Sequence, residues 1–173
     1  MSDLGMGVMI SMLFGSRGGE HLKEVKGKTI KALRLDTEDR GAEDALVFEF
    51  EDGSAIKIYD GGQSCCESRY MHTDDDLPYF VGSKLMDAEL RASGDVVEEE
   101  HGWMYKESEF LIITTSLGQF TIVNYNEHNG YYGGFWIMIA KVSDPTEEKD
   151  DDLGTVLHKD SEHSSTEVEG PKH

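Results

Sequence analysis

The hydrophobic and polar positions between residues 22 and 142 alternate with a period of two over much of this stretch. Alternation of this kind is typical of β-strands that bury one face. The clearest example is residues 45–59, where two alternating runs flank Asp52 and Gly53. An aspartate–glycine pair between such runs favours a tight turn, and we therefore predict a β-hairpin over residues 45–59.

Further elements are predicted along the rest of this stretch. The segment 110–115 is apolar or β-branched throughout, which predicts a strand buried on both faces. Residues 74–81 predict a short helix with Pro78 in its first turn. Other strands are expected over residues 29–36, 85–91, 120–125 and 135–142. Closely spaced strands with few helical periods predict a mainly β fold (α+β at most): an antiparallel sandwich or partly closed barrel with one short helix.

The pattern divides the chain into three parts. Residues 1–20 form an apolar arm rich in Met and Gly, with a glycine hinge at 16–19, and residues 22–142 form a single folded β-rich domain. Residues 143–173 are acidic and poor in apolar side chains, so a disordered tail is expected. The arm is expected either to stay flexible or to dock on the core, a partner or a second copy; the last would give self-association through residues 1–20.

The charge balance narrows the classes of partner. The chain has 16 Lys and Arg residues against 35 Asp and Glu residues, a net charge of −19. Nucleic acids and anionic membranes reward basic side chains, so neither is expected as a direct partner. The apolar segment 4–14 is too short to span a bilayer and no basic residue precedes it, which argues against a membrane span and a secretory signal.

Cys65 and Cys66 are the only cysteines, and they are adjacent. Adjacent residues cannot bridge distant segments, which excludes a disulfide-built secreted scaffold and predicts reduced thiols in a cytoplasmic protein. Neighbouring side chains in a strand point to opposite faces, so no zinc site using both thiols is expected. One of the two is expected to be a small buried side chain.

Two polar segments, 60–76 and 124–135, follow predicted strands. Loops at strand ends commonly carry binding residues, and antiparallel pairing would bring these two segments into one wall. Arg69 is expected to fix a loop by pairing with Glu67 or Asp74. The expected ligand- or partner-binding residues are Cys66, Glu67, Arg69, Asn126, His128, Asn129, Tyr131 and Tyr132. No catalytic residue, metal site or cofactor is predicted.

Several of these residues also belong to sequence motifs that resemble those of other proteins. The Lys28-Thr29-Ile30 strand, the aspartate–glycine hairpin, the Cys65-Cys66-Glu67-Ser68 element and the Asn129-Gly130-Tyr131-Tyr132 element occur in this order. Over about residues 22–142 the chain resembles an uncharacterised family of small domains found in bacteriophage genomes. The resemblance implies a phage or host-associated origin and a domain that works in the bacterial cytoplasm. It implies no activity.

These observations favour a non-enzymatic accessory protein that binds a host protein or a small ligand. One alternative is an acidic mimic of nucleic acid that blocks a DNA-binding host enzyme, because the folded part is itself acidic. A second alternative is a small enzyme that uses Cys65 or Cys66 with Glu67 and His128. That enzyme would need these side chains around a shared cavity.

Overall fold

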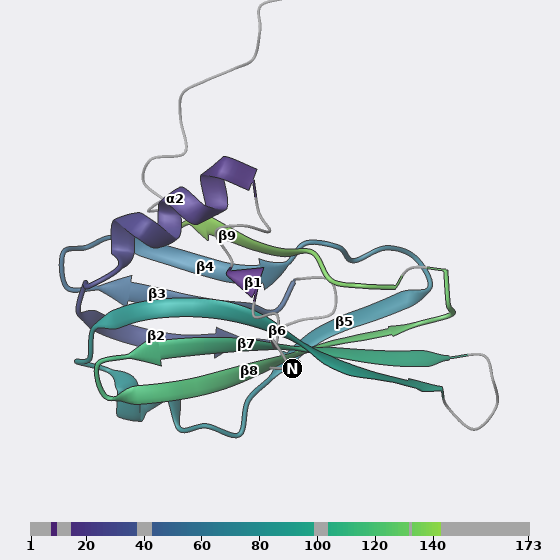
Figure 1. Ribbon diagram of the computed structural model, residues 1–173. Helices are drawn as coiled ribbons and strands as arrows, with labels where there is room; N and C mark the ends of the chain where they lie inside the picture. The colour runs from purple at the N-terminus through teal and green to yellow at the C-terminus, as the bar shows by residue number, and fades with distance from the viewer. Residues whose placement is uncertain (1–7, 10–14, 38–42, 99–103, 132, 143–173) are drawn as a thin grey trace, which may run out of the picture. The chain divides into compact units, whose positions relative to one another are not determined.

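The computed structural model describes residues 8–9, 15–37, 43–98, 104–131 and 133–142 (Figure 1). The expected tail 143–173 and most of the expected arm lie outside this part of the chain. The described elements are β1 (Val8–Met9), α2 (Gly15–Val25), β2 (Ile30–Asp36), β3 (Ala45–Phe50), β4 (Ala55–Asp60), β5 (Glu67–His72), the 3-10 helix η1 (Leu77–Phe80), β6 (Leu85–Glu98), β7 (Tyr105–Thr115), β8 (Gly118–His128) and β9 (Ile137–Lys141).

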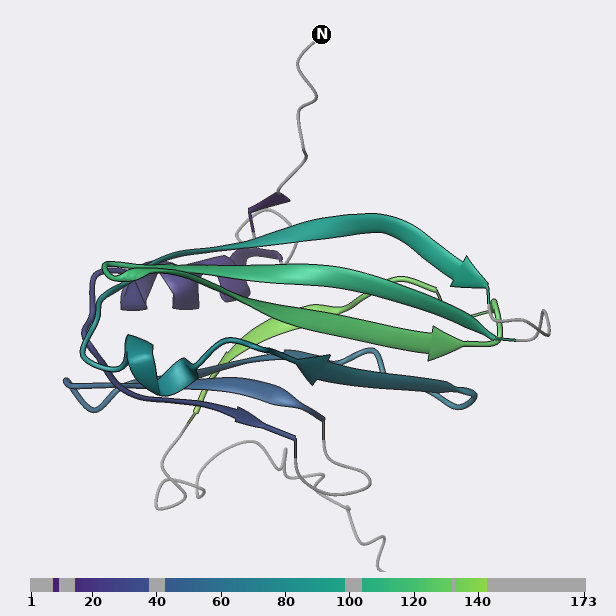
Figure 2. The ribbon, with the colours of Figure 1, turned by 90° about the horizontal axis from the view of Figure 1, so that it is seen from below.

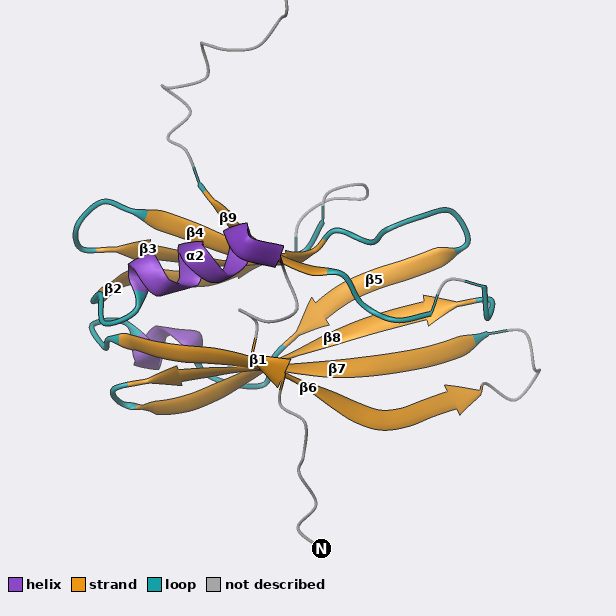
Figure 3. Cartoon of the chain, turned by 45° about the horizontal axis from the view of Figure 1, so that its top comes forward, coloured by secondary structure: helices purple, strands orange, loops and turns teal. Residues whose placement is uncertain are grey.

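The strands form two antiparallel sheets that pack face to face. One sheet has five strands in the order β1-β6-β7-β8-β5, and the other has four in the order β2-β3-β4-β9. Figures 2 and 3 show the two sheets as separate layers. The prediction of a mainly β, antiparallel sandwich is confirmed, and the sheets do not close into a barrel.

The hairpin predicted over residues 45–59 is confirmed. It consists of β3 and β4, with Ala45 opposite Tyr59 and Glu49 opposite Ala55. Phe48 and Ile56 face each other across the ladder and are both buried. The alternation predicted from the sequence therefore points its apolar side into the space between the sheets.

The core fills that space. Its largest fully buried side chains are Phe48, Phe50, Phe120, Ile30, Leu46, Ile56, Ile58, Leu85, Leu111, Ile113 and Ile122. Backbone hydrogen bonds also join the two sheets at the end of the sandwich where these apolar side chains lie. Thr29 pairs with Lys84, and the Ile30 N–H donates to the Ser83 carbonyl. No helix in the described part of the chain is long and apolar enough to cross a membrane.

The strand at 110–115 departs from its prediction. It belongs to β7, where Leu111 and Ile113 are fully buried but Phe110 and Ile112 are only partly buried. The prediction of two buried faces is wrong because the second sheet covers only one face of this strand. An unbroken apolar run in the sequence cannot by itself distinguish the two cases.

The predicted hinge at 16–19 is also wrong, because these residues belong to α2. The helix lies over β9 (Figure 1) and buries Leu22 and Val25 in the core. Burial of these two side chains stabilises a helix that its glycines would otherwise disfavour. The helix predicted within 74–81 is a single 3-10 turn, η1, with Pro78 in its first turn.

Candidate functional site

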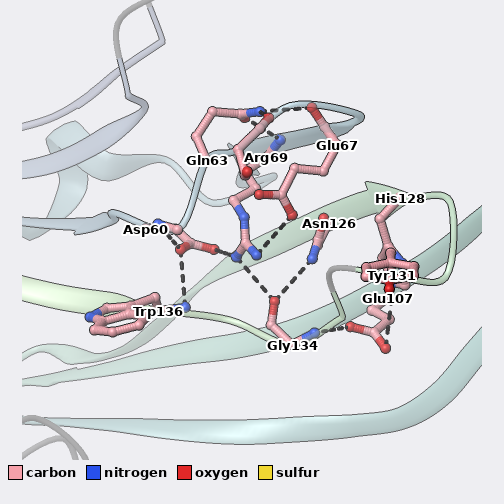
Figure 4. Close-up of polar contacts among 12 residues, drawn as sticks. Asp60, Gln63, Glu67, Arg69, Glu107, Asn126, His128, Tyr131, Gly134 and Trp136 are labelled. Carbon is pink, nitrogen blue, oxygen red and sulfur yellow. Dashed lines mark hydrogen bonds and ion pairs between the residues drawn. The ribbon is translucent and has the colours of Figure 1, made fainter.

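The two polar segments singled out in the sequence lie side by side. β5 pairs with β8, so that Glu67 lies opposite His128 and Arg69 lies opposite Asn126. The side chains of these four residues point toward the inside of the sandwich, beyond the apolar core. Figure 4 shows Arg69 and Asn126 converging on Gly134, in the segment that leads from β8 back to β9.

Arg69 is the centre of this arrangement. Its side chain is only 8% exposed, and its guanidinium donates to Asp60 Oδ2 at 2.7 Å, to Glu67 Oε2 at 3.0 Å and to the Gly134 carbonyl at 3.0 Å. Burial alone would lower the pKa of Arg69, but the hydrogen bonds that it donates to Glu67 and Asp60 raise the pKa above its ordinary value. The expected pairing with Glu67 is present, while Asp74 pairs with His72 instead.

Asp60 is a site residue that the sequence analysis did not select. It ends β4 and is buried, and its Oδ1 atom accepts hydrogen bonds from the backbone N–H groups of Gly62 and Trp136, each at 3.0 Å. Asp60 thus holds two loop segments as well as Arg69. The sequence pattern could have indicated this residue, because Asp60 continues the alternation that places Ile56 and Ile58 on the inner face.

Gly134 is held by both of its backbone groups. Its carbonyl accepts from Arg69 and from Asn126 Nδ2 at 3.0 Å, and its N–H donates to Glu107 Oε2 at 2.5 Å. Glu107, on β7, is a second residue that the sequence analysis missed. Residues 133–136 belong to no strand, so side chains supply hydrogen bonds that a β-ladder would otherwise give.

His128 fixes the start of the same loop. Its Nδ1 atom accepts a hydrogen bond from the Gly130 N–H at 3.0 Å. The proton of the neutral ring must therefore sit on Nε2, which lies 3.6 Å from Glu107 Oε1. The Tyr105 ring stacks on the imidazole, with 5.8 Å between the ring centroids.

Gly130 and Gly62 allow close approaches that other residues would block. Gly130 has a φ of +87°, and a Cβ atom there would lie 2.9 Å from the Tyr105 ring. A Cβ atom at Gly62 would lie 2.8 Å from the centre of the Arg69 guanidinium. Both positions therefore need glycine for space, and Gly130 also needs it for its backbone conformation.

Two aromatic side chains project from the segments that this network holds. Trp136 is 65% exposed and Tyr131 is 85% exposed. The Tyr131 N–H donates to Asn129 Oδ1 at 3.1 Å, an Asx turn that fixes the backbone locally. Tyr132, also predicted as a site residue, lies outside the described residues.

Cys65 and Cys66 are free and exposed, so the prediction that one is buried is wrong. They lie in a turn rather than in a strand, and Cys66 has a φ of +66°. A hydrogen bond and charge repulsion from Cys65, together with some desolvation, raise the pKa of the Cys66 thiol. The argument made against a zinc site, that neighbouring side chains in a strand point to opposite faces, therefore does not apply to these two cysteines. Within the described residues, no group of three or more His, Cys, Asp and Glu side chains could hold a metal ion.

Glu109 adds a titratable group to the inner face. It lies opposite Asn124 in the β7–β8 ladder, and its carboxyl is half-buried. Desolvation, with a smaller contribution from the charge of Asp60, raises the pKa of Glu109 to about 7. The carboxyl therefore titrates near neutral pH.

The outer face of the same strands carries a separate polar cluster. Lys106 Nζ donates to Tyr70 Oη at 2.7 Å and to Glu127 Oε1 at 3.0 Å. It also lies 4.5 Å from the centre of the Tyr125 ring. These bonds raise the pKa of Lys106 and lower that of Glu127. The cluster is a partly exposed ion pair between aromatic rings, which stabilises the pairing of β5, β8 and β7.

The chain was compared with protein families, curated proteins and solved structures. The model of a family described as a domain of unknown function (DUF7448) matches residues 23–138. No curated protein and no solved structure matches the chain.

Proposed function

We propose that the chain, which belongs to the DUF7448 family of unknown function, is a non-enzymatic module. It binds a partner protein through Trp136 and Tyr131. The resemblance to phage-associated domains supports the finer form of the proposal: a phage-type accessory protein in the bacterial cytoplasm, with a host protein as partner.

The observation that carries the proposal is a pair of exposed aromatic side chains on a fixed backbone. The Trp136 N–H is bonded to the buried Asp60, and the neighbouring Gly134 is held on both sides. Tryptophan and tyrosine, with arginine, are enriched among the residues that contribute most of the binding energy in protein interfaces. A backbone that is already ordered loses less entropy on binding, which favours affinity.

The two alternatives have less support. For an enzyme, the Cys66 thiol has a raised pKa, which reduces the thiolate, and the Glu67 carboxylate is committed to Arg69. For a nucleic-acid mimic, bare rows of carboxylates are needed. Several surface carboxylates instead pair with bases, as in Arg34–Glu49, Lys28–Asp52 and Lys26–Asp87.

The test is capture of partners from a bacterial host lysate by the full chain and by three variants. Trp136→Ala and Tyr131→Ser remove the two exposed rings, and Tyr79→Ala removes a ring that is 60% exposed on η1. Figure 2 shows η1 at the end of the sandwich away from the C-terminal end of β8. We expect each of the first two variants to weaken a specific complex at least about thirtyfold, the minimum for an interface hot spot. Tyr79→Ala should not change it.

Equal thermal stability of the variants would show that the loss is local. If the captured protein binds Trp136→Ala and Tyr131→Ser as tightly as the unchanged chain, the proposal is wrong. It is also wrong if Tyr79→Ala alone abolishes the complex.

A further inference from the structure

The pair of exposed thiols is a feature that the proposed function does not use. Cys65 and Cys66 are free, adjacent and exposed in the turn that joins β4 to β5. We propose that this turn is a bidentate site for a soft, thiophilic ion that is satisfied by two sulfur ligands, the class that includes trivalent arsenic.

The backbone conformation of the turn allows both thiols to point to one side of the chain. In an extended strand the two side chains would diverge, but Cys66 is in the left-handed region with a φ of +66°. It is the one non-glycine residue with positive φ in the part of the chain that the structure describes. The interaction between the two thiols, seen in the raised pKa of Cys66, agrees with this placement.

Polar contacts hold the turn in this shape. The Gln63 side-chain amide donates to the carbonyls of Ser64 and Glu67, at 2.9 Å and 2.7 Å, and so closes the turn that contains both cysteines. Gln63 Oε1 in turn accepts from the Arg69 N–H at 3.0 Å, as Figure 4 shows. The turn is thereby tied to the buried Arg69, so the two donors are ordered before an ion arrives.

The two thiol donors determine which class of ion can bind at this turn. Sulfur ligands prefer soft ions, whereas structural zinc commonly takes four protein ligands. Among the described residues no third His, Cys, Asp or Glu joins the two thiols in a metal-binding group. An ion that needs only two sulfur atoms therefore fits this turn, and zinc does not.

The binding reaction balances without an oxidant. When an arsenoxide, R–As=O, binds, two As–S bonds form and the two S–H bonds break. The oxygen leaves as water and carries away both thiol protons. Arsenic stays trivalent, and neither sulfur is oxidised.

The site can be tested with phenylarsine oxide on the full chain in its reduced form. We expect one phenylarsenic group per chain, loss of both thiols to a thiol reagent, and release by a small dithiol but not by a monothiol. Cys65→Ser and Cys66→Ser should each bind at least about a hundredfold more weakly, because a chain with one thiol cannot form the second, intramolecular As–S bond. Circular dichroism should show that both variants keep the fold, since both positions are exposed.

A second pair of variants tests the contribution of the turn. Gln63→Ala keeps both cysteines but removes the bridge, and we expect binding about tenfold weaker, as for other losses of preorganisation. Gln119→Ala, which removes an exposed glutamine on β8 that donates a hydrogen bond to Thr114, is the matched control and should bind normally. Trp136→Ala should also bind normally, so this inference does not depend on the proposed function.

Two results would overturn the inference. If either single-serine variant binds phenylarsine oxide as tightly as the unchanged chain, the two thiols do not act together. If Gln63→Ala and the urea-unfolded chain both bind as tightly as the folded protein, the fold contributes nothing to the site.

Discussion

The inner face of β7 and β8 is aliphatic at one end of the sandwich and polar at the other, although the same two-residue alternation runs through both. At the first end Ile113 and Ile122 are fully buried against the second sheet. At the other end the inward positions carry Glu109, Asn124 and Asn126, the last two of which are buried as well. On β8 burial is therefore similar at the two ends, whereas on β7 the inward positions of the polar end are only partly buried, and at both strands the residue types differ.

The difference follows from what lies opposite each end. The aliphatic end faces regular strands, whose backbone groups are satisfied mainly within their own sheet, with the Ile30 N–H as an exception. The polar end faces the irregular segments that follow β4 and β8, whose backbone groups need other partners. Asp60, Arg69 and Glu107 bind the backbone groups of Gly62, Gly134 and Trp136. The polar end thus holds loops in place, and those loops carry the exposed aromatic rings and thiols.

Exchanging aliphatic and polar residues at the boundary between the aliphatic end and the polar end should have the largest effect on stability. Ile122→Asn puts an amide into the aliphatic end, and we expect unfolding free energy to fall by about 5 kcal/mol, because apolar packing is lost and a polar group is buried without partners. Asn124→Leu moves the boundary by one inward position. It removes a buried oxygen without a hydrogen-bond partner and one weak bond to the Glu109 carbonyl, so its effect should be within about 1 kcal/mol.

Urea unfolding of both variants measures the difference. Similar losses for Ile122→Asn and Asn124→Leu would contradict the view that the two ends differ in what they require.

Removing the buried cation should give the next largest effect. Arg69→Met leaves Asp60 and Glu67 buried without their partner, and we expect a loss of about 3–4 kcal/mol. Arg34→Met is the matched control, because Arg34 pairs with Asp36 and Glu49 on the surface and should cost no more than about 1 kcal/mol. Chemical denaturation measures both, and equal losses would show that burial of the Arg69 network is not what matters.

Some of this organisation could be predicted from the sequence. The hairpin at 45–59 needs only local signals, namely alternation and an aspartate–glycine turn. The pairing of the two polar segments followed from the expectation of antiparallel strands, and the register Glu67–His128 confirms it. Asp60 and Glu107 were missed, although both lie at inward positions, because a charged residue at such a position usually marks the end of a strand's buried face.

The remaining features depend on contacts that no local pattern reveals. The exposure of Cys65 and Cys66 depends on a turn that Gln63 closes and Arg69 holds. Helix α2 forms across a glycine-rich segment because Leu22 and Val25 are buried by distant strands. In both cases tertiary contacts decide the local structure, and one-dimensional periodicity does not contain them.

Two glycines in the same loop should separate close packing from backbone conformation. Gly130 and Gly134 have φ values of +87° and +88°, but only Gly130 lies against a ring, that of Tyr105. We expect Gly134→Ala to cost about 1 kcal/mol from backbone conformation alone, and Gly130→Ala about 2–3 kcal/mol because overlap is added. Thermal unfolding measures both, and equal costs would mean that the Tyr105 contact does not constrain the loop.

The smallest expected effect is on pH dependence. The pKa of Glu109 is raised to about 7, so the folded protein holds this proton more tightly than the unfolded chain, which releases it near 4.5. Stability contributed by this group is present at acidic pH and is lost as the pH rises toward 7. Glu109→Gln should remove that loss, worth about 1 kcal/mol after allowance for solvent screening.

Urea midpoints at about pH 5 and about pH 8 measure this effect, with the exposed Glu51→Gln as control. A Glu109→Gln variant whose stability changes with pH as much as that of the unchanged chain would contradict the assignment.

The most direct test of the central claim is hydrogen exchange at the backbone N–H groups of Trp136 and Gly134. If buried side chains hold these loops as a ladder would, both amides exchange slowly, and Asp60→Asn and Glu107→Gln each speed the exchange of the amide that they bind. Exchange of both amides at the rate of an open loop in the unchanged protein would contradict the account.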